Sequence, residues 1–310
     1  MSKFSYSTKI GSALFPNPIF TASGCAANGK ELSAFFPLSD IGAVVTKSVM
    51  SQPRSGRATP RMAETPSGML NAIGLQGPGI EVFLKEDLPW LVAHGARTVV
   101  SIAGESVDEF AALSRKVRSA HGVSAIEVNI SCPNVENRGL VFACDPNSAR
   151  EVIEAVKRSV GNTIPIIAKL SPDVTDIVSI AREVVAAGAD GLAMINTLLG
   201  MVINTETMRP HLANKTGGLS GPAIRPVAVR AIYQVHRALP EVPIVGMGGV
   251  LTGTDAFELI LAGASAISVG TATFHDPGAP VRIKSELENI LINRGFANFS
   301  EAVGYAHRGE

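Results

Sequence analysis

Residues 165–197 read PIIAKLSPDVTDIVSIAREVVAAGADGLAMINT, an apolar run, a helical pattern and a second apolar run. The two runs, 165–171 and 191–197, are short and show no regular alternation of apolar and polar residues. Such continuous apolarity is typical of strands that are buried on both faces of a parallel sheet. Between them a helix is expected over 173–188, with Asp173 as its N-terminal cap. The stretch therefore predicts a strand, a crossover helix and a parallel strand.

The same kind of apolar run occurs eight times along the chain, with helical patterns such as 106–120 and 252–263 between the runs. Eight strand–helix units predict an α/β fold, the (β/α)8 TIM barrel. The alternative is an open doubly wound sheet, for which a Rossmann glycine fingerprint would be expected. The eight expected strands are 18–23 (PIFTAS), 43–49 (AVVTKSV), 98–103 (TVVSIA), 125–131 (AIEVNIS), 165–171 (PIIAKLS), 191–197 (GLAMINT), 243–249 (PIVGMGG) and 266–272 (AISVGTA).

The two longest gaps between these strands follow strands 2 and 6. They hold residues 50–79 and 198–221, which are rich in Gly, Pro, Asn and Thr. Long loops at the C-terminal ends of barrel strands are where active sites are built in this fold. Because no linker or low-complexity segment interrupts the pattern, residues 1–310 are predicted to form a single domain.

Composition excludes several classes of protein. The chain has 310 residues with 27 basic and 27 acidic side chains, and its formal net charge is zero. A nucleic-acid or anionic-membrane partner would need a clustered positive field, which this balance argues against. Charged residues make up 17% of the chain, below the roughly 25% of an average soluble domain. This low charge suggests that part of the surface lies under a partner subunit.

The cysteines and the N-terminus predict a cytoplasmic protein. No apolar run approaches the about 18 residues of a membrane span, and the first fifteen residues lack the apolar core of a signal peptide. Cys25, Cys132 and Cys144 are an odd number of cysteines, which fits a reducing compartment better than a disulfide framework. Neither CxxC nor HExxH occurs, so no metal site is predicted.

Polar residues and glycines follow most of the expected strands, where a barrel would face its substrate. A single Asn or Ser there can equally be a helix cap or a turn residue. Lys47 and Lys169 are more informative, because a lysine in a barrel mouth needs an anion or a dipole to offset its desolvation. The full set is Ser23, Lys47, Ser101, Asn129, Lys169, Asn196, Thr197, Gly248, Gly249, Gly270 and Thr271.

The glycines after strands 7 and 8 predict a phosphate site. Gly248-Gly249 and Gly270-Thr271 stand where this fold commonly binds a phosphate. Backbone N–H groups can approach phosphate oxygens closely when no Cβ intervenes. The alternative is a pair of tight turns between strands and helices.

The segment NISCPNV at 129–135 directly follows the fourth expected strand. A free cysteine is usually a small core residue, and that interpretation suits Cys25 and Cys144. It fits Cys132 poorly, because Cys132 lies at the functional end of a strand. As a thiolate, Cys132 could act as a nucleophile or a general base.

The chain resembles the class 1 dihydroorotate dehydrogenases over essentially its whole length. The matching strings, in order, are TASG, TKS, PRSGRATPRMAETPSGMLNAIGLQGPG, VNISCPNV, AKLSP, INT, GMGG and VGTA. The resemblance implies an FMN-containing barrel of pyrimidine (UMP) biosynthesis that oxidises (S)-dihydroorotate to orotate. The string ENRGLVFACDP after the cysteine is most similar to the catalytic subunit of subclass 1B. That subclass implies a homodimer core and a partner subunit, with FAD and an iron–sulfur cluster, that passes electrons to NAD+.

The resemblance also implies roles for individual residues. Cys132 would be the base that removes a proton from C5 of dihydroorotate while hydride leaves C6 for FMN. Where the family usually has Asn, this chain has Ser101, so a weaker or water-bridged contact to the flavin is expected. The implied substrate residues are Lys47, Asn71, Ala72, Ile73, Gly74, Leu75, Asn129, Asn134, Asn196 and Thr197. The implied cofactor residues are Ser23, Lys47, Ser48, Ser101, Asn129, Lys169, Ile195, Gly221, Gly248, Gly249, Gly270 and Thr271.

Four other functions are compatible with parts of the pattern. A dihydropyrimidine dehydrogenase-like subunit would share the barrel, FMN and cysteine but act on uracil or thymine. A subclass 1A enzyme would use fumarate as its electron acceptor. A Schiff-base aldolase would use Lys169, which leaves Cys132 and the NAIGLQ string at 71–76 unexplained. A non-catalytic barrel is disfavoured by the many polar residues at strand ends.

Overall fold

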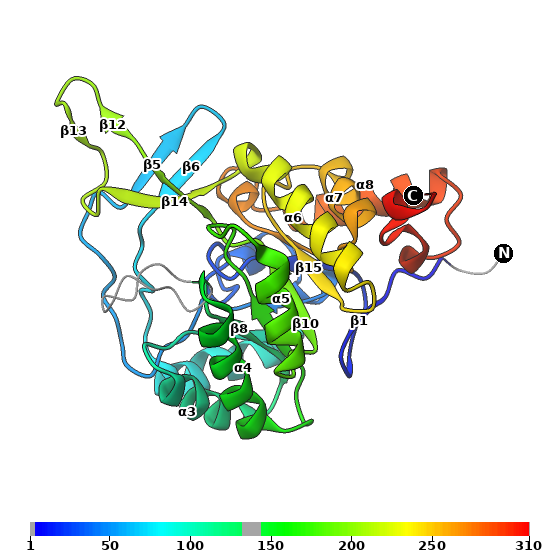
Figure 1. Cartoon of the computed structure of the whole chain (residues 1–310), viewed down its shortest axis with the longest axis horizontal. Helices are drawn as coiled ribbons and strands as arrows, with labels where there is room; N and C mark the ends of the chain where they lie inside the picture. The colour runs from blue at the N-terminus through cyan, green and yellow to red at the C-terminus, as the bar shows by residue number, and fades with distance from the viewer. Residues whose placement is uncertain (1–3, 132–143, 310) are drawn as a thin grey trace.

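A computed structural model of the chain describes residues 4–131 and 144–309. Eight parallel strands form one sheet in the order β3-β16-β15-β10-β9-β8-β7-β4 (Figure 1). A parallel bridge between Phe20 and Ala43 joins the two edge strands, so the sheet closes into a barrel. The predicted TIM barrel is confirmed. The strands are β3 (Ile19–Thr21), β4 (Val44–Val45), β7 (Thr98–Ile102), β8 (Val123–Asn129), β9 (Ile166–Lys169), β10 (Gly191–Met194), β15 (Ile244–Gly246) and β16 (Ala266–Val269).

Helices surround this barrel and bury one face each against it. In α4, seven residues are buried, among them Val152, Ile153 and Val156, whose spacing places them on one side of the helix. The α-helices are α1 (Ile80–Val82), α2 (Leu88–Ala93), α3 (Val107–Arg118), α4 (Pro146–Val160), α5 (Ile177–Ala186), α6 (Arg225–Ala238), α7 (Gly253–Ala262) and α8 (Ala279–Asn293). Shorter helical segments are η1 (Leu32–Ala34), η2 (Leu38–Asp40), η3 (Phe83–Asp87), η5 (Pro222–Ile224), η6 (Thr271–Phe274), η7 (Phe299–Ala302) and η8 (Tyr305–His307).

The N-terminal cap predicted for α5 is wrong. The helix begins at Ile177, and the side chain of Asp176 accepts hydrogen bonds from the N–H groups of Val178 and Ser179. A capping side chain reaches N–H groups two and three residues ahead of it, and Asp173 lies too far upstream for that. Asp173 instead accepts the N–H of Leu199, so it connects the loop after β9 to the loop after β10.

The two long loops after strands 2 and 6 do not stay separate. Segments from both form one four-stranded antiparallel sheet in the order β11-β14-β6-β5, which projects from the barrel in Figure 1. The central pairing joins residues 69–71 to residues 218–220. The strands are β5 (Met62–Thr65), β6 (Gly68–Asn71), β11 (Leu198–Met201) and β14 (Thr216–Ser220), and a hairpin of β12 (Ile203–Asn204) and β13 (Arg209–Pro210) extends from them.

A hairpin near the N-terminus plugs the opposite end of the barrel. Strands β1 (Thr8–Ile10) and β2 (Ala13–Phe15) pair with each other, and Ile10 and Phe15 are fully buried. The ring of Phe15 lies 4.7 Å from that of Phe20 inside the barrel. Because the N-terminal mouth is filled by this apolar plug, the C-terminal mouth is the end that can bind a ligand. No helix in the described part of the chain is both long and apolar enough to cross a bilayer.

Candidate active site

A cavity of about 600 Å³ opens at the C-terminal ends of the barrel strands. This volume lies within the roughly 300–1,000 Å³ typical of small-molecule sites. Its walls come from strand ends and from the projecting sheet, so the loops after strands 2 and 6 complete the site together. Predicted residues that line it are Ser23, Lys47, Ser48, Asn71, Ile73, Gly74, Leu75, Asn129, Lys169, Ile195, Asn196, Thr197, Gly221, Gly248, Gly249, Gly270 and Thr271.

The floor of the cavity follows from the period-two geometry of the strands. Val45, Val99, Ala125 and Ile167 belong to the apolar cluster inside the barrel. Side chains two residues further along a strand point the same way, one layer higher. That next layer holds Lys47, Ser101, Glu127 and Lys169. A polar layer therefore lies directly on the apolar one, at the level where the cavity begins.

Glu127 is the residue of this layer that the sequence analysis missed. Its side chain is 3% exposed, and its Oε1 atom lies 3.6 Å from Nζ of Lys169. Lys169 also donates a hydrogen bond of 2.9 Å to Oγ of Ser23. A buried ammonium and a buried carboxylate each need such partners. The signal for Glu127 was a lone acidic residue within the apolar run AIEVNIS at 125–131.

Ser101 does not reach the cavity. Its side chain is fully buried behind the lining, where its hydroxyl donates to Oε1 of Glu127 over 2.8 Å. Its oxygen lies 2.9 Å from Oγ of Ser48, which does line the cavity. The short side chain that replaces the family's asparagine thus contacts two neighbouring side chains. A contact between Ser101 and a flavin stays a prediction.

Two amide side chains of the cavity lining belong to a hydrogen-bond network that includes Ser48. Asn129 donates through Nδ2 to Oγ of Ser48 over 2.9 Å. Its Oδ1 accepts the hydroxyl of Ser131 over 2.9 Å, and Oγ of Ser131 accepts Nδ2 of Asn196 over 2.6 Å. Asn196 accepts the N–H of Thr197 over 2.7 Å. These contacts place the predicted substrate residues Asn129, Asn196 and Thr197 on one connected network. Ser131 was not predicted.

The segment 71–75 crosses the mouth of the cavity. Gly74 and Leu75 both have positive φ angles, 79° and 55°, and such an angle is uncommon for a residue with a side chain. Ala72, within this segment, is buried in an apolar cluster with Leu70 and Leu212, so this predicted substrate residue is not part of the cavity lining.

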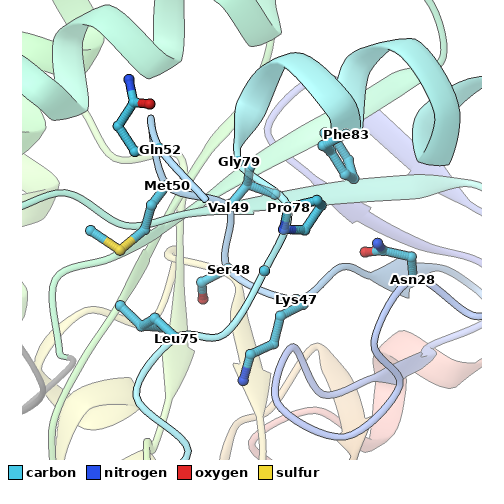
Figure 2. A pocket seen from close by; sticks show the side chains of 11 residues that line it. Asn28, Lys47, Ser48, Val49, Met50, Gln52, Leu75, Pro78, Gly79 and Phe83 are labelled. Carbon is cyan, nitrogen blue, oxygen red and sulfur yellow. The ribbon is translucent and has the colours of Figure 1, made fainter. Parts of the chain in front are cut away.

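A narrow recess of about 10 Å³ adjoins this mouth. It shares Lys47, Ser48 and Leu75 with the main cavity. Figure 2 shows the side chains of Lys47 and Ser48 directed to the same side of the chain after β4, with Leu75 beside them. Lys47 therefore lines both the main cavity and the recess beside it.

Glycines line the part of the cavity that is formed by the loops after β14 and β15. Gly221, Gly248 and Gly249 have φ angles of 91°, 128° and 74°. A Cβ on Gly249 would lie 2.9 Å from the carbonyl oxygen of Gly221, so the two loops approach too closely for a side chain. The hydroxyl of Thr271 lies 2.8 Å from that of Ser220, another lining residue that was not predicted. Backbone N–H groups in such loops can bind a phosphate.

Ser268 adds an unpaired polar atom to the wall. It is 2% exposed, lines the cavity, and has no hydrogen-bond partner for its Oγ among the described residues. Buried hydroxyl groups are normally paired. A polar ligand in the cavity would supply the missing partner, so the lining fits a bound group that carries hydrogen-bonding atoms.

The interpretation of Cys25 and Cys144 as core residues is wrong for Cys144, which is exposed, and Cys25 is only partly buried and lines the cavity. Burial raises the pKa of Cys25 to about 11, although the nearby charges of Lys169 and Lys47 oppose the shift. Cys25 therefore stays protonated near neutral pH. Cys144 is exposed, and partial burial, followed by the charge of Asp173, raises its pKa. The predicted site residues Cys132 and Asn134 lie outside the described residues.

A closed (β/α)8 barrel with a polar, phosphate-compatible cavity at its C-terminal mouth defines a barrel enzyme. In the described ranges no group of three or more His, Cys, Asp or Glu side chains could hold a metal ion. The family model described as dihydroorotate dehydrogenase matches residues 5–291. The chain belongs to the dihydroorotate dehydrogenase family.

Curated relatives align with nearly the whole chain. A protein of Desulforudis audaxviator is 48% identical over 299 residues, covering 96% of both chains. Proteins of Desulforamulus reducens and Geotalea daltonii are 47% and 48% identical, each covering 98% of this chain and 99% of the relative. All three are named "Dihydroorotate dehydrogenase B (NAD(+)), catalytic subunit".

Proposed function

We propose that this chain is the catalytic subunit of a dihydroorotate dehydrogenase of subclass 1B, which oxidises (S)-dihydroorotate to orotate in pyrimidine biosynthesis. The observation that carries the proposal is full-length similarity to relatives of that name, combined with a cavity lined by nearly all the residues expected for such a site. The test is the formation of orotate from dihydroorotate with an artificial dye as acceptor. Absence of turnover by the pure, flavin-loaded protein would contradict it.

FMN is the proposed cofactor, and when bound it supplies an acceptor for the hydride that leaves C6 of the substrate. Gly221, Gly248, Gly249, Gly270 and Thr271 would hold its phosphate end. Ser23, Ser48, Lys169 and Ile195 would contact the ring. The unpaired hydroxyl of Ser268 and the close approach of Gly249 to Gly221 support this fit.

The amide groups and Lys47 would orient the substrate. Dihydroorotate is a small anion whose ring carries both hydrogen-bond donors and acceptors, so apolar contact alone cannot orient it. Asn71, Asn129 and Asn196 offer both kinds of group from three directions. Lys47 would bind the carboxylate under the 71–75 segment.

Cys132 is the proposed base. It directly follows Ser131, whose hydroxyl is held by Asn129 and Asn196. Its thiolate would take the proton from C5 of dihydroorotate, and the thiol would return that proton to water. Cys25 does not suit this role, because burial keeps its thiol protonated.

The environment of Lys169 disfavours the aldolase alternative. A Schiff-base lysine attacks as a neutral amine. The Lys169 side chain is 6% exposed and is held between the carboxylate of Glu127 and the hydroxyl of Ser23, which suits an ammonium. The names of the relatives favour dihydroorotate over uracil or thymine as the substrate.

Electrons are proposed to leave through a partner subunit that carries FAD and an iron–sulfur cluster and reduces NAD+. The words "catalytic subunit" in the names of the relatives support a second subunit. We further propose a homodimer core, which the low proportion of charged residues fits, and a cytoplasmic location, which the three cysteines fit.

We expect the purified protein to carry one non-covalent FMN per chain. The glycine loops and the unpaired Ser268 hydroxyl motivate this expectation. Heat or acid should release the flavin into the supernatant, where chromatography identifies it. A colourless protein that takes up no FMN on reconstitution would contradict the cofactor assignment.

Gly249→Ala is expected to weaken FMN binding at least tenfold. The added Cβ would lie 2.8 Å from that of Arg225 and 2.9 Å from the oxygen of Gly221, so the phosphate loops must separate. The measurement is a titration of the apoprotein with FMN, in which the quenching of flavin fluorescence reports binding. Gly161→Ala is the matched control, because Gly161 has a φ of 62° but open space around its Cβ. It should cost about 1–3 kcal/mol of stability and leave FMN affinity intact, and equal affinities for both variants would contradict the prediction.

A further inference from the structure

A chain of hydrogen bonds runs from the buried carboxylate of Glu127 to the amides that line the cavity. Glu127 itself does not line the cavity, and its side chain is 3% exposed. It accepts the hydroxyl of Ser101, and its charge is balanced by Lys169 at 3.6 Å. Because an ionised carboxylate can only accept hydrogen bonds, Glu127 is the acceptor at which this series of hydrogen bonds ends.

The proton of each hydroxyl group can be assigned by elimination, beginning at Glu127. The single proton of Ser101 points to Glu127, so the 2.9 Å contact between Ser48 and Ser101 requires Ser48 to donate. The oxygen of Ser48 then accepts Nδ2 of Asn129. Three successive donors therefore point toward the carboxylate.

The same direction continues on the far side of Asn129. With Nδ2 committed to Ser48, Oδ1 of Asn129 accepts the hydroxyl of Ser131. The oxygen of Ser131 accepts Nδ2 of Asn196, whose Oδ1 accepts the N–H of Thr197. Every hydrogen bond from Asn196 to Glu127 thus runs in one direction.

An asparagine amide can turn over at little cost when its neighbours are hydroxyl groups that can also reverse. Here they cannot reverse. A turned Asn129 would direct Oδ1 at Ser48, whose proton is already given to Ser101, and two buried acceptors would face each other. The charge on Glu127 fixes the direction of the hydrogen bonds from Ser101 to Asn129, whereas the backbone N–H of Thr197 fixes the amide of Asn196 from the other end.

We propose that Glu127 is a positioning residue that fixes, through Ser101 and Ser48, which way the amide of Asn129 faces the substrate. The inference rests on the proposed function, since that amide is assigned to the dihydroorotate ring. Under this proposal a carboxylate outside the cavity determines which hydrogen-bond donors and acceptors face the substrate ring. The amide N–H groups that remain free of protein partners would then donate to that ring.

The test is a double-mutant cycle with Glu127→Gln and Ser101→Ala. A glutamine at position 127 keeps the shape of the side chain but can donate a hydrogen bond to Ser101, so the direction of the hydrogen bonds is no longer imposed. An alanine at position 101 removes the hydrogen bond to Glu127 and leaves Glu127 beside Lys169. The measured quantities are the Kd of orotate, from the change in the flavin spectrum, and kcat and KM for dihydroorotate.

Each single variant is expected to weaken orotate binding and raise KM about tenfold, with FMN stoichiometry preserved. The double variant should be no worse than Glu127→Gln alone, because both changes interrupt one chain. An unchanged Kd in Ser101→Ala, or losses that multiply in the double variant, would overturn the proposal and assign Glu127 only to charge balance with Lys169.

Two further measurements separate this proposal from other causes. Ser114→Ala removes a fully buried hydroxyl that donates to Phe110 within α3, away from the cavity, and should leave the Kd unchanged. If Glu127→Gln fails to fold, Ser101→Ala by itself still decides the outcome. Failure of the wild type to bind orotate would contradict the proposed function. Wild-type binding that Ser101→Ala leaves unchanged would contradict only the positioning role of Glu127.

Discussion

Replacing Cys132 by alanine is expected to lower dihydroorotate oxidation by roughly 10²–10⁴-fold, the usual contribution of a positioned general base. The variant should keep its fold and its FMN, because the cofactor residues lie elsewhere in the sequence. The measurement is anaerobic reduction of the flavin by dihydroorotate in a stopped-flow instrument. This isolates the chemical step from any later electron transfer.

Cys144→Ala is the matched control, since Cys144 is exposed and should reduce its flavin at the wild-type rate. Near-normal flavin reduction in Cys132→Ala would contradict the assignment of the base. Cys132→Ser should retain little activity near neutral pH, because a hydroxyl is a far weaker base than a thiolate.

The pH dependence distinguishes Cys132 from Cys25. An ordinary thiol has a pKa of about 8.5, so a rate that depends on the Cys132 thiolate should rise with pH and level off above that value. Burial raises the pKa of Cys25 to about 11. A rate that kept rising to pH 11 would therefore point to Cys25 instead.

The isolated chain is expected to reduce artificial dyes with dihydroorotate but to form NADH at least a hundredfold more slowly. The chain has one candidate phosphate site, no Rossmann glycine fingerprint, and three cysteines that form no cluster motif for iron–sulfur binding. Electrons that leave the barrel therefore need an external carrier to reach NAD+. The measurement is steady-state turnover of the pure chain with dye, NAD+ or fumarate offered separately.

Co-expression with an electron-transfer subunit of the proposed kind should restore NADH formation, which provides the positive control. Fast NADH formation by the chain alone would overturn the partner proposal. Fast turnover with fumarate would instead assign the chain to subclass 1A.

The barrel could be predicted from sequence because its signals are local. Each strand is a short apolar run, and the structure places a strand at all eight predicted ranges, with β8 beginning at Val123, before the predicted start at 125. The other strands are shorter than predicted, with β4 reduced to Val44–Val45. Runs such as 43–49 continue past the sheet into residues that line the cavity. The length of an apolar run therefore overestimates the length of the strand that is paired in the sheet. The predicted cap at Asp173 failed because Asp176 offers the same side chain three residues later, where the helix begins.

The residues at the strand ends could be identified from the amino-acid sequence, since a period of two and the polar residue after each apolar run are local properties. Which of these residues meet in space depends on the tertiary fold. The pairing of residues 69–71 with 218–220 joins segments about 150 residues apart, and no local pattern encodes it. The inward direction of Glu127 and the burial of Ser101 behind Ser48 likewise depend on how neighbouring strands are staggered. Hydrogen bonds between side chains act over about 3 Å in space, and separation along the chain does not reveal them.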